Sequence, residues 1–278
     1  DMKGLLRRLS SAVIFVIVML GGVYGGRYSF IFLFSIIACI CLWEFFCLVL
    51  ARHKRRDLFR QIIGLLMGLM PLMLVVIYQL SFTRAERFIA IASILFFPFV
   101  FMAFIYELYS RSERPFQNIA FMITGMVYIG IPFALLHFIA FDNGSFRTNT
   151  ILGLLLLTWV NDTGAYLVGS RLGRRPLFPS ISPKKTWEGT LGGALITLGI
   201  ACLVSLLLGE LLLWQWLVLA LIVVIFGGIG DLVESMLKRS ARVKDSGTIL
   251  PGHGGLLDRF DAFIFLLPYA AAFILWIR

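Results

Sequence analysis

The chain has 278 residues, of which 60% are hydrophobic and 14% charged, and its formal net charge at pH 7 is +10. A mean hydropathy of +0.93 excludes a soluble globular domain. Repeated apolar runs of about 20 residues predict an all-α, polytopic integral membrane protein, and they lack the alternating pattern of a transmembrane β-barrel. The basic net charge is explained by membrane topology, so we expect no nucleic-acid partner.

Apolar segments divide the chain into about nine candidate transmembrane helices. In chain order they cover residues 10–25, 28–51, 58–82, 85–110, 116–141, 148–171, 186–208, 213–238 and 260–277. The first is short, and could be tilted, re-entrant or paired with the second as a hairpin. It has no small-residue cleavage pattern, which favours a retained helix over a signal peptide.

The basic residues predict the orientation. If the N-terminus is cytoplasmic, 20 of the 25 Lys and Arg residues fall on the cytoplasmic side and 5 on the outer side. This bias follows the positive-inside rule. The two most polar loops, 171–185 and 239–259, then face the cytoplasm.

The segment from Asp231 to Asp261 holds five of the fifteen acidic residues, close to two apolar helices. One stripe of the eighth span carries four polar residues at helical spacing: Asp231, Glu234, Ser235 and Lys238. Asp258 and Asp261 share a face at the start of the ninth span. Carboxylates on two helix ends are suitable ligands for Mg²⁺, which binds few protein oxygens together with substrate phosphates. Salt bridges with neighbouring Lys and Arg residues are the alternative.

Between these helices lies a glycine-rich turn, Pro251 to Gly255. The backbone N–H groups of Gly254 and Gly255, followed by a helix N-terminus, could bind phosphate, although the turn could also be only a tight loop. Lys244 and Arg259 flank it and favour phosphate binding. His253 could act as a general base or phosphate donor, or could simply pack in the loop.

Acidic residues also occur inside the apolar spans. Asp162, next to Asn161, lies deep in the sixth span, where an unpaired charge costs about 2.5–3.5 kcal/mol. We therefore expect Asp162 to face a wet cavity or a cation, with a helix-end Arg as the structural alternative. Glu44 and Glu107 stand alone beside aromatic residues, and we interpret both as structural.

A basic loop follows the sixth span. Pro179 and Pro183 prevent the helix from continuing, and four basic residues gather around them: Arg174, Arg175, Lys184 and Lys185. Such a patch is typical of cytoplasmic loops and of contacts with anionic lipid. Beside a magnesium site it would instead bind a polyphosphate.

The pattern S-x-x-K-R-x4-K-D-x-G-x2-L-P-x-H-G-G-x-x-D-R-x-D, from Ser235 to Asp261, resembles the signature of the phosphatidate cytidylyltransferases. The fixed positions are Ser235, Lys238, Arg239, Lys244, Asp245, Gly247, Leu250, Pro251, His253, Gly254, Gly255, Asp258, Arg259 and Asp261. The segments Asn161 to Tyr166 and Ser182 to Gly189 resemble companion motifs of that family. The resemblance covers residues 158–278, and residues 1–150 match only as generic membrane helices.

The resemblance implies a nine-helix enzyme of phospholipid biosynthesis, usually a homodimer, in the bacterial cytoplasmic (inner) membrane with its active site facing the cytoplasm. It would join CTP and phosphatidic acid to give CDP-diacylglycerol and pyrophosphate, using Mg²⁺ and K⁺ as a candidate second cation. Residues 1–150 would then be a scaffold for dimer and lipid contacts, and residues 151–278 the catalytic region.

Site roles follow from the resemblance and from the spacing together. The metal ligands would be Asp231 and Asp258, with Asp261 and Asp162 as second choices, and Lys238 would act with these aspartates in catalysis. The residues expected to bind CTP or phosphatidate are Asn161, Asp162, Ser182, Lys185, Glu188, Ser235, Arg239, Lys244, His253, Gly254, Gly255 and Arg259, with Glu188 orienting Lys185.

Two other readings of the sequence remain open. A CTP-dependent enzyme could act on another lipid, such as an archaeal ether lipid phosphate or a polyprenol. An ion transporter would also explain acids within the membrane, but not their concentration on one membrane face. If the protein were purely a structural scaffold, the five acidic residues between Asp231 and Asp261 would have no role.

Overall fold

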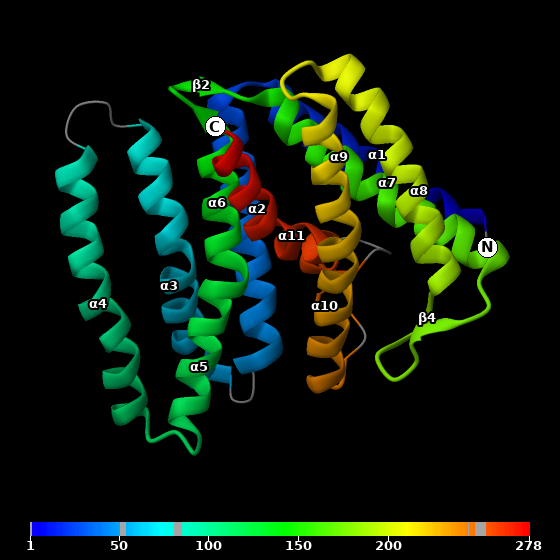
Figure 1. The fold of residues 1–278 in the computed structure, drawn as a ribbon. Helices are drawn as coiled ribbons and strands as arrows, with labels where there is room; N and C mark the ends of the chain where they lie inside the picture. The colour runs from blue at the N-terminus through cyan, green and yellow to red at the C-terminus, as the bar shows by residue number, and fades with distance from the viewer. Residues whose placement is uncertain (1, 51–53, 81–84, 244, 248–253) are drawn as a thin grey trace. The chain divides into compact units, whose positions relative to one another are not determined.

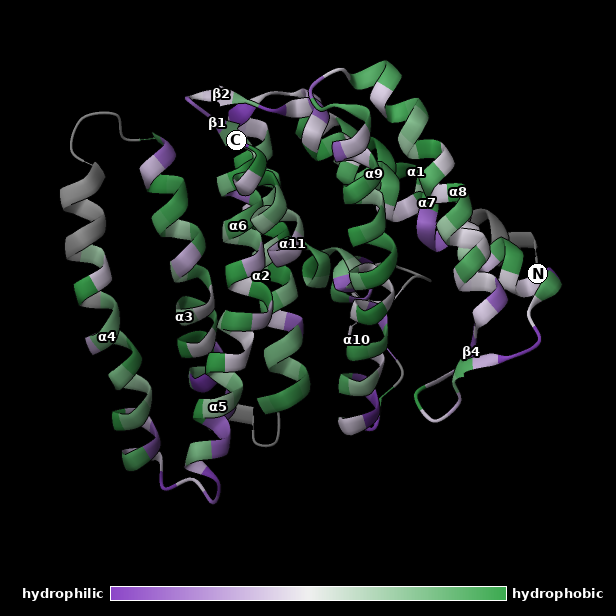
Figure 2. Ribbon diagram, in the orientation of Figure 1, coloured by the Kyte–Doolittle hydropathy of each residue, from purple (hydrophilic) through white to green (hydrophobic). Residues whose placement is uncertain are grey.

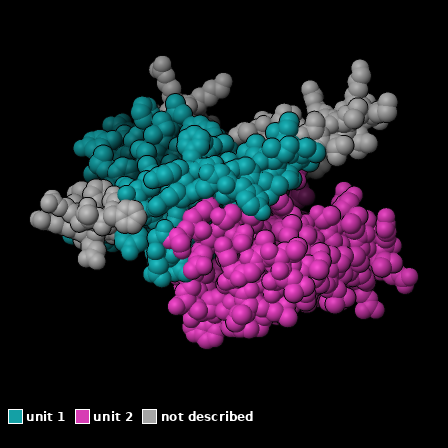
Figure 3. All heavy atoms as spheres, turned by 90° about the horizontal axis from the view of Figure 1, so that it is seen from above, with its two compact units in different colours: residues 1–144, 245–258 teal, residues 145–244, 259–278 magenta. Residues whose placement is uncertain are grey.

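The computed structural model describes residues 2–50, 54–80, 85–243, 245–247 and 254–278 (Figure 1). The chain forms two compact units, coloured separately in Figure 3. Unit 1 contains residues 1–144 and 245–258, and unit 2 contains residues 145–244 and 259–278. The segment 245–258 of the signature therefore groups with the N-terminal helices, whereas the sequence pattern placed it in the C-terminal catalytic region.

Unit 1 is built from long helices. They are α1 (Met2–Tyr24), α2 (Arg27–Leu50), α3 (Lys54–Leu80), α4 (Ala85–Ser110), α5 (Pro115–Gly125) and α6 (Ile131–Ile139), with a π-helical segment, η1 (Met126–Gly130), between α5 and α6. A short strand, β1 (Phe141–Asp142), pairs with β2 (Ser145–Phe146) at the start of unit 2.

Unit 2 continues with α7 (Thr148–Leu172), β3 (Pro176–Phe178), β4 (Ser182–Thr186), α8 (Trp187–Leu208), α9 (Leu213–Ile222), the π-helical η2 (Val223–Gly227) and α10 (Gly228–Ser240). The last helix, α11 (Leu257–Ile277), begins in unit 1 and runs through unit 2. Strands β3 and β4 form an antiparallel hairpin within the basic loop, in which Phe178 pairs with Ser182.

The expected class of fold is confirmed. Among the described residues, eight helical segments are long and apolar enough to cross a membrane, and Ala12–Tyr24 is a shorter apolar segment. Figure 2 shows hydrophobic residues along most of the helices and hydrophilic ones concentrated in loops and at helix ends. The protein is an integral membrane protein, while the exact count of nine spans and the cytoplasmic N-terminus stay predictions.

Helix α2 forms the core of unit 1. Its phenylalanines Phe30, Phe34, Phe45 and Phe46 are at most 1% exposed. Glycines on the neighbouring helices make room for them, because a Cβ atom at Gly64 would lie 2.9 Å from the ring of Phe46. Close approach through small residues is the usual means of packing helices in lipid, where there is little hydrophobic force between them.

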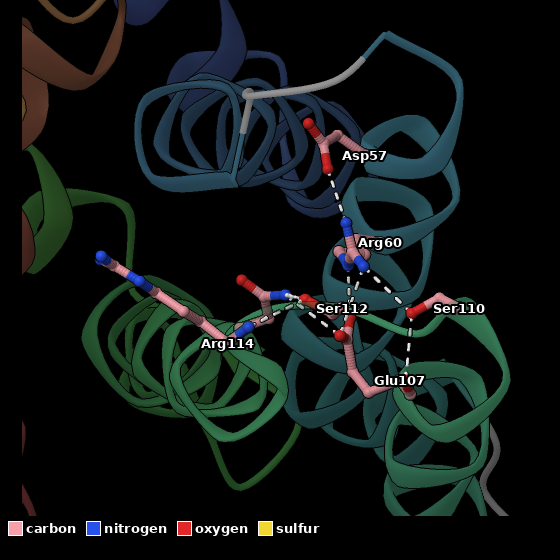
Figure 4. A network of polar contacts seen from close by, with 7 residues as sticks. Asp57, Arg60, Glu107, Ser110, Ser112 and Arg114 are labelled. Atoms are coloured by element: carbon pink, nitrogen blue, oxygen red, sulfur yellow. Dashed lines mark hydrogen bonds and ion pairs between the residues drawn. The ribbon is translucent and has the colours of Figure 1, made fainter.

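A buried polar network joins α3, α4 and α5 (Figure 4). The guanidinium group of Arg60 lies between Asp57, at 2.7 Å, and Glu107, and it also donates to Ser110 at 3.0 Å. Asn118 donates to Glu107 at 3.0 Å. The sequence neighbourhood of Glu107 suggested an isolated acidic residue, but in the structure Glu107 has several polar partners. Its partners support the structural interpretation.

Candidate active site

Three aspartates from three helices of unit 2 form an acidic cluster. Asp162 on α7, Asp231 on α10 and Asp261 on α11 lie close enough to one another for their charges to interact. Asp162 is exposed, Asp231 is partly exposed, and Asp261 is buried, with its Oδ1 atom accepting a hydrogen bond from the N–H of Ala262 at 2.6 Å. We refer to these three residues as the acidic cluster.

Glycines bring the helices of the cluster together. A Cβ atom at Gly230 would lie 2.8 Å from the carbonyl oxygen of Asp261, so only a glycine lets α10 lie this close to α11. On the other side, Gly193 of α8 packs directly on α7, where a Cβ atom would lie 2.9 Å from the backbone nitrogen of Ala165. Gly230, next to Asp231, and Gly193, on the helix packed against the one that carries Asp162, thus serve close packing of the backbone.

Lys185 adds a positive charge to the acidic cluster. Its Nζ atom lies 2.5 Å from the Oδ2 atom of Asp231 and 3.3 Å from the carbonyl oxygen of Gly228, and its charge also interacts with Asp162. The residue lies on β4, so the β3–β4 hairpin presents it to the N-terminal end of α10. Gly228 directly follows η2, and π-helical segments within α-helices often occur at functional sites.

A second ion pair lies one turn further along α10. Lys238 pairs with Glu234, whose side chain is fully buried, and Lys238 also lies close enough to Asp261 for their charges to interact. Salt bridges were the alternative explanation for these acidic residues in the sequence. The structure contains such pairs between Lys185 and Asp231 and between Lys238 and Glu234. They leave the acidic cluster in place: of its three carboxylates, Asp231 pairs with Lys185, whereas Lys238 pairs with Glu234, outside the cluster.

The other residues predicted for unit 2 lie on the helices and the hairpin that carry the cluster and Lys185, or at the start of α8. Asn161 is buried on α7, Ser235 is partly buried and Arg239 exposed on α10, Arg259 is exposed on α11, and Ser182 lies on β4. Glu188 accepts hydrogen bonds from the backbone N–H groups of Arg174, at 3.0 Å, and Arg175, at 3.2 Å. Glu188 therefore holds the two ends of the basic loop together, and any effect of Glu188 on the position of Lys185 acts through the conformation of that loop.

Unit 1 holds the signature residues from Asp245 to Asp258. The Oδ2 atom of Asp258 accepts three hydrogen bonds: from the N–H of Ser246 at 2.9 Å, from its hydroxyl at 2.9 Å, and from the N–H of Gly255 at 2.8 Å. Gly254 has φ +81°, which favours glycine, and a Cβ atom there would lie 2.8 Å from Asp258 Oδ2. Asp258 is thus an organising residue of the turn.

In the described part of the chain, three N–H groups at and just after the end of the turn are donated to protein carboxylates. The N–H of Gly255 is donated to Asp258, and those of Leu256 and Leu257 are donated to Glu44. Phosphate binding by Gly254 and Gly255 stays a prediction, and in this structure the N–H of Gly255 has a protein carboxylate as its acceptor. Lys244 and His253 lie outside the described residues.

Sequence reasoning missed the role of Glu44. Its position inside an apolar helix was visible, but its partners lie more than 200 residues away in the chain. The signal available in the sequence was an isolated acidic residue in a membrane helix, which indicates a polar partner or a functional role.

The acidic cluster has the right chemistry for a hard cation, although it is not a closed metal site. Among the described residues, no group of three His, Cys, Asp or Glu side chains is arranged to hold a metal ion by itself. Mg²⁺ does not need such a cage, because one or two carboxylates suffice when substrate phosphates and water complete its shell. Asp231 and Asp258 belong to different units, so their sharing one ion stays a prediction.

The comparison with known proteins decides the family. The model of the cytidylyltransferase family matches residues 6–277. The chain belongs to the cytidylyltransferase family. This membership confirms the resemblance drawn from the signature and the assignment to the nucleotidyltransferase class of enzymes.

Several curated bacterial proteins are similar to this chain, and the length of the matching region differs among them. The phosphatidate cytidylyltransferase of Bacillus subtilis (strain 168) is 36% identical over 271 residues, which cover 97% of this chain and 96% of that protein. Those of Staphylococcus saprophyticus and Staphylococcus aureus (strain COL) are 41% and 43% identical over 169 and 170 residues, covering 60% of this chain and 64% of each relative. The match to the staphylococcal proteins thus spans less than two thirds of their length.

Proposed function

We propose that this protein is a phosphatidate cytidylyltransferase, which converts CTP and phosphatidic acid into CDP-diacylglycerol and pyrophosphate. The observation that supports this best is the acidic cluster of Asp162, Asp231 and Asp261 with Lys185 on Asp231, in a chain of the cytidylyltransferase family. The Bacillus subtilis relative is named phosphatidate cytidylyltransferase, which agrees with this substrate pair.

The reaction is an in-line displacement. An oxygen of the lipid phosphate forms a bond to the α-phosphorus of CTP, and the bond from that phosphorus to the bridging oxygen of the β-phosphate breaks. The electron pair leaves with pyrophosphate. A phosphate monoester has a second pKa of about 6, so the lipid nucleophile is already ionised at neutral pH and needs no strong general base.

The protein's task is therefore to bring two anions together and to neutralise charge on the leaving group. Lys185 and Lys238 lie at the acidic cluster and would bind phosphate oxygens, together with Arg239 and Lys244 of the signature. Asn161, Asp162 and Ser182 would shape the polar surface on which the nucleotide and lipid headgroup meet.

Magnesium is the cofactor that this donor set fits. Asp231 would hold it, with Asp261 and Asp162 as neighbouring carboxylates and Asp258 one helical turn before Asp261 on α11. When bound, Mg²⁺ supplies positive charge to the phosphates of CTP. K⁺ is proposed as a second cation on the same carboxylates.

We place the site at the cytoplasmic face of a bacterial inner membrane. The 20-to-5 distribution of basic residues supports this orientation, with a cytoplasmic N-terminus and nine spans. A homodimer, with residues 1–150 supplying dimer and lipid contacts, is part of the same proposal.

The direct test uses purified protein in detergent with radiolabelled CTP, phosphatidic acid and Mg²⁺. We expect thin-layer chromatography to show a labelled lipid that forms with pyrophosphate in equal amounts. A labelled product only with an ether lipid phosphate would change the substrate, and phosphorylation of a polyprenol would change the reaction. Ion flux in proteoliposomes without nucleotide, and no labelled lipid, would replace the proposal with a transporter.

A further inference from the structure

Glu44 is an acidic residue in the C-terminal third of the apolar helix α2, and it is only 3% exposed. Its carboxylate accepts a hydrogen bond from the N–H of Leu256 on Oε1, at 3.1 Å, and from the N–H of Leu257 on Oε2, at 2.7 Å. The hydroxyl of Ser246 lies 3.5 Å from Oε2. All of these residues belong to unit 1.

A charge at this depth needs compensation, and Glu44 receives it from α11. The first N–H groups of a helix have no partner within the helix, and the N-terminal end of its dipole favours a negative charge. A carboxylate bound by such N–H groups forms charge-assisted hydrogen bonds, about twice as strong as neutral ones. Glu44 therefore fixes the start of the helix that carries Asp258 and Asp261.

Two signature glycines make this approach possible. A Cβ atom at Gly255 would lie 2.7 Å from Oε2 of Glu44 and would also collide with the hydroxyl of Ser246. A Cβ atom at Gly247 would collide with the carboxylate of Glu44. The glycines at these positions thus accommodate a side chain of α2 that the signature itself does not include.

Ser246 connects Glu44 to Asp258. It occupies a variable position of the signature, between Asp245 and Gly247. Its N–H and hydroxyl both donate to Oδ2 of Asp258 at 2.9 Å, and the N–H of Gly255 makes a third bond to the same atom. Three donors on one carboxylate oxygen fix the direction of the carboxylate.

We propose that Glu44 and Ser246 are positioning residues of the active site, which hold Asp258 in the orientation needed to bind the cation. The N-terminal helices would then contribute directly to catalysis through α2 rather than serving only as a scaffold. The inference rests on the proposed function for the identity of the cation, but the hydrogen bonds can be tested without any substrate.

The first arm measures amide hydrogen exchange of the purified protein in detergent. Glu44→Gln keeps the size of the side chain but leaves only one acceptor oxygen for two N–H groups. We expect the amides of Leu256 and Leu257 to exchange at least about tenfold faster in this variant. Glu107→Gln is the matched control, because Glu107 is equally buried in unit 1 and bonds to Arg60 and Asn118 instead. Unchanged exchange at Leu256 and Leu257 would overturn the role of Glu44.

The second arm measures how much Mg²⁺ is needed to raise the thermal stability of the protein, without CTP or lipid. Loss of an outer contact to a metal ligand typically costs about 10–100-fold in metal affinity. We expect Ser246→Ala to raise the midpoint Mg²⁺ concentration by about tenfold or more, and Ser246→Thr, which keeps the hydroxyl, to restore it. Equal midpoints for the wild type and Ser246→Ala would refute the role of Ser246, whether or not Glu44→Gln folds.

The two proposals can fail separately. If the wild type makes no labelled lipid from CTP and phosphatidic acid while both arms give the expected shifts, the proposed substrate pair is wrong and the positioning roles stand. If labelled lipid forms but neither arm shows a shift, the enzyme assignment stands and the positioning roles are wrong.

Discussion

The Nζ atom of Lys185 lies 2.5 Å from the Oδ2 atom of Asp231, and the two side chains are 25% and 37% exposed. At the cytoplasmic membrane surface, where we propose that the site lies, ion pairs exposed to this extent contribute only about 0–1 kcal/mol. Exchange of Lys185 for a metal ion on Asp231 would therefore cost little. The pair combines an anion-binding group and a cation-binding group at one point, which suits an enzyme that binds a nucleotide together with its metal.

Replacement of Lys185 tests its role toward phosphate. We expect Lys185→Ala to lower kcat/KM for CTP by about 100-fold, because a fixed positive charge at the transferred phosphates is lost. The measurement is the initial rate of labelled lipid formation at limiting CTP. Lys184→Ala is the control: Lys184 is an exposed neighbour on the same strand, and its loss should change the rate by no more than a few-fold. Equal losses in the two variants would mean that only general positive charge matters.

Neutralisation of the acidic cluster tests the metal assignment. We expect Asp231→Asn and Asp261→Asn each to lower turnover by about 100-fold or more at limiting Mg²⁺, since each removes a carboxylate that attracts the cation. Asp162→Asn should have a smaller effect that high Mg²⁺ partly reverses. Turnover is measured across a Mg²⁺ titration with radiolabelled CTP.

Glu210→Gln is a suitable control for this series. Glu210 lies in unit 2 outside the acidic cluster and accepts hydrogen bonds from the N–H of Thr150 at 2.7 Å and of Asn149 at 3.2 Å, at the start of α7. Its change should lower thermal stability but leave the Mg²⁺ dependence as in the wild type. Near wild-type turnover of Asp231→Asn at limiting Mg²⁺ would show that the metal is held elsewhere.

Local sequence patterns were sufficient for the helices and for most of the acidic cluster. The segment expected at 148–171 is the helix Thr148–Leu172, and that expected at 186–208 is Trp187–Leu208. Polar residues or glycines end the long apolar runs, so the sequence itself indicates where these helices begin and end. The spacing of Asp231, Glu234 and Lys238 likewise predicted a shared stripe, and Glu234 and Lys238 do form a pair across one turn.

Contacts between distant segments could not be read from such patterns. Nothing near Glu44 in the sequence indicates that its partners are Leu256 and Leu257, since the pairing depends on how α2 packs against the turn. The π-helical segment η2 and the hydrogen bond from Lys185 to Gly228, the first residue after it, also depend on packing. The hydrogen bond from the N–H of Gly255 to Asp258 was likewise not indicated by the glycine-rich pattern, and phosphate binding by the turn stays a prediction.

The network around Arg60 predicts a large effect on stability. Arg60 and Glu107 are both almost fully buried, so Glu107→Ala leaves the guanidinium group without its main counter-charge (Figure 4). Breaking a buried ion pair on one side typically costs about 3–5 kcal/mol. We expect Glu107→Ala to lower the thermal unfolding temperature of the purified protein markedly. Arg114→Ala, whose exposed side chain extends away from Arg60, should have almost no effect, and a small change in Glu107→Ala would show that other groups neutralise Arg60.

Membrane orientation can be tested with single cysteines in a variant that lacks the four native ones, Cys39, Cys41, Cys47 and Cys202. Ser180→Cys, in the turn of the β3–β4 hairpin, should react with an impermeant maleimide only in inverted vesicles or after permeabilisation, because this basic loop is assigned to the cytoplasm. Asn143→Cys, in the turn between β1 and β2, should react in intact cells. Each position is the control for the other, since both lie in short hairpin turns. Labelling of Ser180→Cys in intact cells would invert the topology and would place the acidic cluster on the side of the membrane where CTP is absent.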